Sequence, residues 1–238
     1  MENSTYATLT RQSGLMKEMR VIANNIANAA TSGYRQEGIT FSEYVAAVDQ
    51  DHSSISMATA NVRETSILQG GLTKTGGTFD LAIEGEGYFL VQTPDGDRLT
   101  RAGAFTPNSN GDLVTADGYP VLDSGGAPVF IPTGADSIGI AADGTISAGG
   151  TPIGQVGIVQ PNDPKELLRQ DGVMFNAPSG FDAAPDARLV QGFLEDSNVD
   201  PILQISRMIE VQRAYELGQS FLDKEDERIR NVLQSMSR

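Results

Sequence analysis

The sequence predicts an α+β protein, in which long N- and C-terminal helices form a coiled-coil-like domain beside a central antiparallel all-β domain. Two distributions along the 238 residues support this class. Of the 26 glycines, 22 lie between Gly70 and Gly192, and all 11 prolines lie between Pro94 and Pro201. Because glycine and proline weaken helix interiors and mark turns, short strands are expected in the middle and helices at the ends.

The N-terminal helix is predicted over roughly residues 4–31. Apolar residues recur there at alternating steps of four and three, which places them on one helical face. Gly33 follows and is expected to cap the helix in a left-handed conformation. The residues of this face are Leu15, Met19, Ile22, Ile26 and Ala29.

The C-terminal helix is predicted over residues 201–236. Asp200 is a favourable N-cap and Pro201 suits the first helical position. The same four-three spacing recurs, although a glycine and a glutamate occupy two positions of the face. Its residues are Val211, Tyr215, Gly218, Leu222, Glu225, Ile229, Val232 and Met236. We expect the apolar members of both faces to form an assembly interface.

Three domains follow from these boundaries. Residues 1–66 comprise the N-terminal helix and a connecting segment, and they pair with the C-terminal helix in 191–238. Residues 67–190 form the β domain, whose Asn/Asp-Gly turns begin at residues 95, 110, 117 and 143. Residues 34–66 remain ambiguous, with a short helix possible over residues 41–48.

Three asparagines in the N-terminal helix, Asn24, Asn25 and Asn28, are unusual because asparagine is a mediocre helix former. Two interpretations stay open. They form an exposed polar face, or they form a hydrogen-bonding strip between helices that fixes their register.

Composition excludes several classes of function. The formal net charge is −14, so the basic footprint of a nucleic-acid-binding protein is missing. No apolar run approaches 18 residues, which argues against direct membrane insertion, and the N-terminus lacks the apolar core of a cleaved signal peptide. The negative charge is concentrated in residues 39–200, whereas both ends are close to neutral.

The sequence supports no catalytic, cofactor-binding or metal site. Cysteine is absent and His52 is the one histidine, which leaves few nucleophile–base arrangements. Glu84 and Glu86 could form a glycosidase-like carboxylate pair, and residues 108–112 resemble part of a calcium loop. Simple turns account for both patterns better than a catalytic site or a calcium site does. The alternative from another class is therefore a secreted enzyme or calcium-binding β domain with helical extensions.

Three groups of motifs resemble flagellar basal-body rod and hook proteins. The first comprises residues 22–28 (IANNIAN) and 31–35 (TSGYR). The second comprises residues 78–89 (TFDLAIEGEGYF) and 101–105 (RAGAF). The third comprises residues 192–199 (GFLEDSNV) and 208–216 (MIEVQRAYE). They follow the family's order along essentially the whole chain.

The resemblance implies a structural axial subunit without enzymatic activity, cofactor or small-molecule substrate. The short length and the N-terminal residues Tyr6, 9–12 (LTRQ), 18–19 (EM) and 21–25 (VIANN) look most like the proximal rod protein of the family, with the distal rod protein and then the hook protein as alternatives. The implied partners are copies of itself, other rod subunits and the flagellar type III export apparatus. The implied location is the periplasmic rod of the basal body, reached without a cleaved signal peptide, where the subunit would form a torque-transmitting helical tube.

Overall fold

The computed structural model describes residues 2–46, 55–135 and 137–236. The chain divides into two compact units. Unit 1 comprises Met1–Ala27, Glu37–Ser66 and Asp200–Arg238, and unit 2 comprises Asn28–Gln36 and Ile67–Val199.

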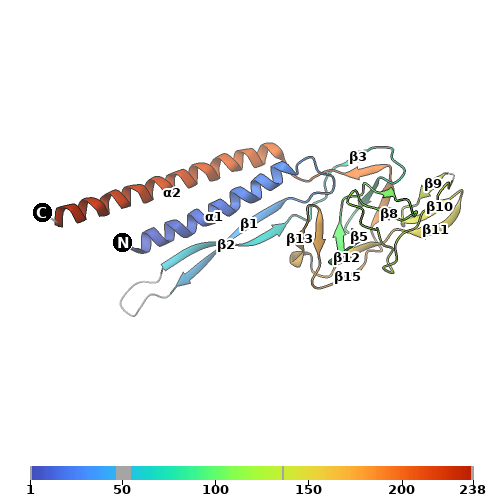
Figure 1. Cartoon of the computed structure of the whole chain (residues 1–238), viewed down its shortest axis with the longest axis horizontal. Helices are drawn as coiled ribbons and strands as arrows, with labels where there is room; N and C mark the ends of the chain where they lie inside the picture. The colour runs from blue at the N-terminus through green and yellow to red at the C-terminus, as the bar shows by residue number, and fades with distance from the viewer. Residues whose placement is uncertain (1, 47–54, 136, 237–238) are drawn as a thin grey trace. The chain divides into compact units, whose positions relative to one another are not determined.

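Unit 1 consists of two helices and a β-hairpin. Helix α1 (Glu2–Ala27) and helix α2 (Pro201–Met236) lie side by side with their chain termini at the same end, so they are antiparallel (Figure 1). Strands β1 (Glu37–Ala46) and β2 (Ile55–Thr65) pair antiparallel, with an irregularity of register after Thr40, and the hairpin packs against α1.

The ends of the helices reflect their capping chemistry to different degrees. The Asp200 carboxylate accepts hydrogen bonds from the backbone N–H groups of Ile202 and Leu203 at 2.9 and 3.1 Å, so α2 begins at Pro201. Helix α1 ends at Ala27, earlier than expected, and Gly33 therefore lies six residues beyond it rather than at its cap. Gly33 nevertheless has a φ of +70°.

The predicted coiled-coil-like domain is wrong. Unit 1 is a mixed α and β unit, because the ambiguous segment forms a hairpin that packs on α1. The sequence allows a short helix over residues 41–48, but residues 41–46 belong to strand β1. Residues 47 and 48 lie outside the described residues. The two helices also lie side by side over only part of the length of α2. Gln12 donates a hydrogen bond to the Tyr215 carbonyl, so the start of α1 lies level with about residue 225 of α2.

Unit 2 is β-rich and also contains one 3₁₀ helix, η1 (Pro164–Glu166), so the predicted all-β character is corrected as well. Its largest sheet has six antiparallel strands in the order β13-β14-β6-β5-β12-β15. Their bounds are Leu168–Gln170, Met174–Asn176, Gly96–Thr100, Tyr88–Thr93, Ile158–Pro161 and Phe181–Ala183.

Smaller sheets complete unit 2. A three-stranded sheet joins β11 (Thr151–Gln155), β10 (Thr145–Ala148) and β9 (Ile138–Ile140). Three strand pairs join β16 to β4, β17 to β3 and β7 to β8. The bounds of the first two pairs are Arg188–Gln191 for β16, Leu81–Glu84 for β4, Phe193–Glu195 for β17 and Leu72–Lys74 for β3. The third pair comprises β7 (Thr106–Pro107) and β8 (Leu113–Val114). The four Asn/Asp-Gly pairs lie in turns, and the glycine φ is positive in each.

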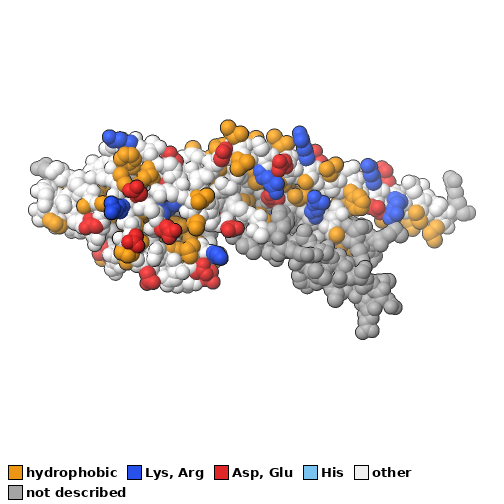
Figure 2. All heavy atoms as spheres, turned by 180° about the vertical axis from the view of Figure 1, so that it is seen from behind, with side chains coloured by type: hydrophobic (Ala, Val, Ile, Leu, Met, Phe, Trp, Pro, Cys, Tyr) orange, Lys and Arg blue, Asp and Glu red, His pale blue; other side chains and the backbone are white. Residues whose placement is uncertain are grey.

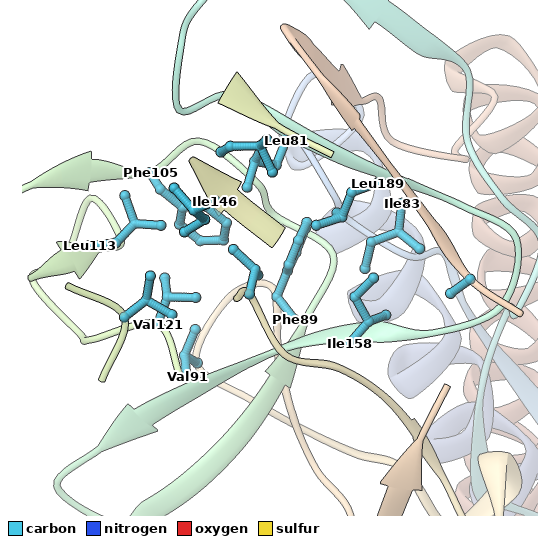
Figure 3. Packing of buried hydrophobic residues seen from close by; sticks show 14 of the residues in the cluster. Leu81, Ile83, Phe89, Val91, Phe105, Leu113, Val121, Ile146, Ile158 and Leu189 are labelled. Atoms are coloured by element: carbon cyan, nitrogen blue, oxygen red, sulfur yellow. The ribbon is translucent and has the colours of Figure 1, made fainter. Parts of the chain in front are cut away.

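Strand β5 separates two hydrophobic clusters in unit 2. Phe89 and Val91 point into the larger cluster, and Tyr88 and Leu90 belong to the smaller one on the opposite face. In the larger cluster the Phe89 and Phe105 rings meet edge to face at 5.0 Å (Figure 3). A strand buried on both faces explains why residues 88–91 read as a continuous apolar run.

Candidate functional site

The helical faces predicted as an assembly interface are only partly buried in unit 1. Leu15, Ile22 and Val211 form the buried cluster between the helices, and Met19, Ile26 and Tyr215 pack around them. Leu222 is half-buried. Ile229, Val232 and Met236 are exposed, because α2 continues past the start of α1.

Among the described residues of α2, large apolar side chains remain exposed along nearly the whole helix. Val232 is 53% exposed and Met236 is 80% exposed. Hydrophobic side chains reach the surface of the helical unit between charged ones (Figure 2). We call this set the exposed α2 surface: Ile202, Leu203, Ile205, Ile209, Leu217, Phe221, Ile229, Val232, Leu233 and Met236. Ten exposed large apolar side chains on one helix are more than the singly scattered apolar residues expected on an ordinary monomer surface.

Asn25 occupies the junction of α1, α2 and the hairpin. Its side chain is 1% exposed. Its amide donates to the Glu37 carbonyl at 2.8 Å and to Gln204 Oε1 at 3.2 Å, and its Oδ1 accepts from the Glu37 N–H at 3.0 Å. The amide thus satisfies both backbone groups of Glu37 as a neighbouring strand would. Asn24 is exposed and Asn28 is half-buried.

Two further polar contacts set the register of α1 against α2. Glu18 is buried and accepts from Arg207 at 2.8 Å, and this hydrogen bond raises the pKa of the Arg207 guanidinium. Gln12 is buried against Gly218, where a Cβ atom would lie 2.6 Å from the Gln12 amide nitrogen. The glycine that interrupts the predicted face therefore makes room for a register-setting glutamine.

A buried ion cluster in unit 2 joins three segments that are distant in the sequence. Glu195 contacts Arg35 through Oε1 at 2.8 Å and Arg101 through Oε2 at 3.0 Å. All three side chains are at most 3% exposed. Burial lowers the pKa of Arg101, an effect that the charge of Glu195 opposes. We call Arg35, Arg101 and Glu195 the buried triad.

The buried triad was not predicted from the sequence. Its three members lie in the motifs TSGYR, RAGAF and GFLEDSNV. The signal available in the sequence is that each of the three groups of motifs carries one of these residues. Their pairing depends on tertiary structure, which a spacing pattern does not reveal.

Gly33 lies beside the buried triad. Its N–H donates to the Glu195 carbonyl at 2.7 Å, and Ser32 Oγ donates to the same carbonyl at 3.0 Å. A Cβ atom at position 33 would lie 2.2 Å from the backbone nitrogen of Ala102. Both the positive φ and this close approach require glycine.

Three models of the flagellar rod and hook proteins match the chain. The model described as flagella basal body rod protein matches residues 7–35, the FlgE/F/G D1 domain model matches 82–148, and the rod FlgEFG C-terminal model matches 190–235. The flagellar basal-body rod protein FlgF of Caulobacter vibrioides is 38% identical over an alignment of 245 positions, which covers 100% of this chain and 99% of that protein. The chain belongs to the flagellar basal-body rod protein family.

Other relatives support this membership. FlgF of Rhizobium meliloti is 37% identical, with 91% of this chain and 90% of that protein covered. FlgG of Bacillus subtilis is 33% identical, with 98% of each chain covered. The resemblance predicted from the motifs is thus confirmed. Membership places the chain in the flagellar basal body, among proteins that assemble with other rod subunits.

The three matched segments each contribute one member of the buried triad. Arg35 ends the first matched segment, Arg101 lies in the second and Glu195 lies in the third. The family's separate motifs therefore meet at one point in unit 2.

The residues considered for enzymatic or calcium chemistry have simpler roles. Glu84 and Glu86 are exposed. Asn108 Oδ1 accepts from the backbone N–H groups of Asn110 and Asp112, so this loop is a hydrogen-bonded turn. Within residues 2–46, 55–135 and 137–236 there is no group of three or more His, Asp or Glu arranged to hold a metal ion. His52 lies outside the described residues.

No helix in the described part of the chain combines the length and apolar character needed to span a membrane. The charged residues Glu18 and Arg207 lie within α1 and α2 and bond to each other.

Proposed function

We propose that the chain is a structural axial subunit of the flagellar basal-body rod, that it transmits torque as part of a helical tube, and that it has no enzymatic activity. The exposed α2 surface carries this proposal. It leaves ten large apolar side chains of α2 exposed to water, and a neighbouring subunit would remove their apolar area from water.

The partners we propose are copies of the same chain and other rod subunits, with delivery to the periplasm by the flagellar type III export apparatus. The buried residues of the predicted interface, Leu15, Ile22 and Val211, would hold unit 1 together. The exposed residues Ile229, Val232 and Met236 would contact neighbours. Asn25 would position the hairpin on α1 and α2.

A proximal position in the rod, as an FlgF-type subunit, is favoured by the FlgF relatives at 36–38% identity. A distal, FlgG-type position is the second candidate, because one FlgG protein is 33% identical over nearly the whole chain. Cross-linking to the neighbouring rod subunits in isolated basal bodies would separate the two positions.

The assembly proposal is tested by Val232→Asp, introduced in place of the cell's own copy. A charge at a site buried by assembly costs several kcal/mol when it has no partner, so motility should be lost. The matched control is Asn231→Asp, which adds the same charge at the adjacent exposed position. Both purified variants should melt like the parent chain. Normal motility of Val232→Asp would contradict the proposal.

A further inference from the structure

Glu195 holds together four parts of unit 2. Its carboxylate bonds to Arg35 and Arg101, and Oε1 also accepts from the Gly70 N–H at 3.1 Å. Its carbonyl accepts from Gly33, and its strand β17 pairs with β3. Glu195 and the residues that it contacts are separated by up to 163 positions in the sequence.

The charges of the buried triad do not balance. Two guanidinium groups share one carboxylate, which leaves one net positive charge in a region that is at most 3% exposed. Arg101 also donates to the carbonyls of Ile83 and Gly85, and Arg35 donates to that of Ile67. These carbonyls solvate the cations only in part, since the Nε atoms of both arginines lack a hydrogen-bond partner within the described part of the chain.

Without Glu195 the same region would bury two cations and no anion. Removing one partner of a buried ion pair leaves an uncompensated charge, which is strongly unfavourable. Arg101 lies next to the core because Gly103, two residues later, packs against the backbone of Leu81 and the Phe89 ring. Closing the core around β4 and β5 therefore draws Arg101 out of water.

We propose that Glu195 is a closure latch, so that unit 2 packs its core only after residues 193–199 have joined β3 and the loop of residues 28–36. A chain released N-terminus first would hold unit 2 open until Glu195 is available. The latch is a property of unit 2, and it stands whether or not the chain is a rod subunit.

The order of folding is tested by pulse-labelling hydrogen exchange during refolding of the full chain from denaturant. The latch predicts that the backbone amides of residues 81–83 and 89–91 gain protection in the same kinetic phase as Gly33, Gly70 and residues 194–196. Protection of the core amides in a separate, earlier phase would overturn the proposal.

Three full-length variants test whether charge is the cause. Glu195→Gln preserves the shape but leaves two unbalanced cations, and it should lower the midpoint of thermal unfolding of unit 2 by roughly 10 °C. Arg35→Met leaves one cation with one anion, so its midpoint should fall less. Glu86→Gln removes an exposed carboxylate and should leave the midpoint unchanged.

The unfolding temperatures of these variants can also contradict the latch proposal. If Glu195→Gln unfolds at the same temperature as Glu86→Gln, the carboxylate does not control closure. If Arg35→Met is less stable than Glu195→Gln, charge imbalance is not the cause. Should Glu195→Gln fail to fold, the pulse-labelling result on the parent chain still decides the proposal.

Discussion

Asn25 shows how one side chain can replace a missing strand. Strand β1 begins at Glu37, whose backbone N–H and carbonyl face α1, where helical backbone groups are already paired among themselves. The Asn25 amide supplies one acceptor and one donor, and it also reaches α2 through Gln204. Aspartate, leucine or alanine at this position could not make all three bonds.

Replacement of Asn25 by alanine should destabilise unit 1 by about 2 kcal/mol, because the buried backbone groups of Glu37 would lose the two hydrogen bonds that Asn25 makes to them. Asn25→Asp should cost more at neutral pH, since a carboxylate would face the Glu37 carbonyl and Gln204 Oε1. Urea unfolding followed by helical ellipticity measures this, as both described α-helices lie in unit 1. Asn24→Ala, in the same turn but exposed, serves as the control. Equal effects at the two positions would argue against the junction.

Tyr88 provides a test of burial through pH. Desolvation raises the pKa of its phenol above the ordinary value of about 10, while the nearby Arg35 and Arg101 partly oppose the shift. The unfolded chain then loses this proton at a lower pH than the folded chain. The contribution of Tyr88 to stability is therefore complete below pH 10 and declines as pH rises from about 10 toward the folded pKa.

We expect Tyr88→Phe to remove that decline. The difference in unfolding free energy between the parent chain and Tyr88→Phe should be constant from pH 7 to 9. It should then shift in favour of Tyr88→Phe above about pH 10, by up to about 1.4 kcal/mol per pH unit. A difference that does not change between pH 8 and pH 11 would show that the phenol is not desolvated.

At the scale of elements, local chemistry predicted some boundaries and not others. The start of α2 could be predicted because Asp200 and Pro201 act within one turn of the helix. The end of α1 could not, because residues 28–36 leave the helix to contact Glu195 and Asn198 in unit 2. The hairpin was missed for the same kind of reason, since β1 and β2 are stabilised by each other and by α1.

The cap of α2 gives an element-scale prediction. Asp200→Ala removes the acceptor for the N–H groups of Ile202 and Leu203 and should destabilise unit 1 by about 1 kcal/mol. Asp200→Asn keeps an acceptor oxygen and should cost much less. Hydrogen exchange at the first turn of α2 reports the effect directly. Similar exchange rates in the alanine and asparagine variants would mean that the carboxylate does not cap the helix.

At the scale of the whole molecule, the predicted family is confirmed and the terminal helices and central strands are observed, but the predicted coiled-coil-like domain is wrong. The four-three spacing continues to Met236, yet α1 covers only part of that face, and the spacing alone does not reveal how far a partner extends. The buried members Leu15, Ile22 and Val211 and the exposed members Val232 and Met236 follow one pattern in the sequence. A spacing rule cannot distinguish a face buried within the subunit from one left for a neighbour.

The most direct test of the assembly proposal is cysteine accessibility. The chain contains no cysteine, so Val232→Cys would introduce a unique thiol on the exposed α2 surface. Its rate of reaction with a maleimide would be measured on the free subunit and on isolated basal bodies, each normalised to the denatured chain. Our account predicts rapid labelling of the free subunit and strong protection in the basal body. Equally rapid labelling in both states would contradict it.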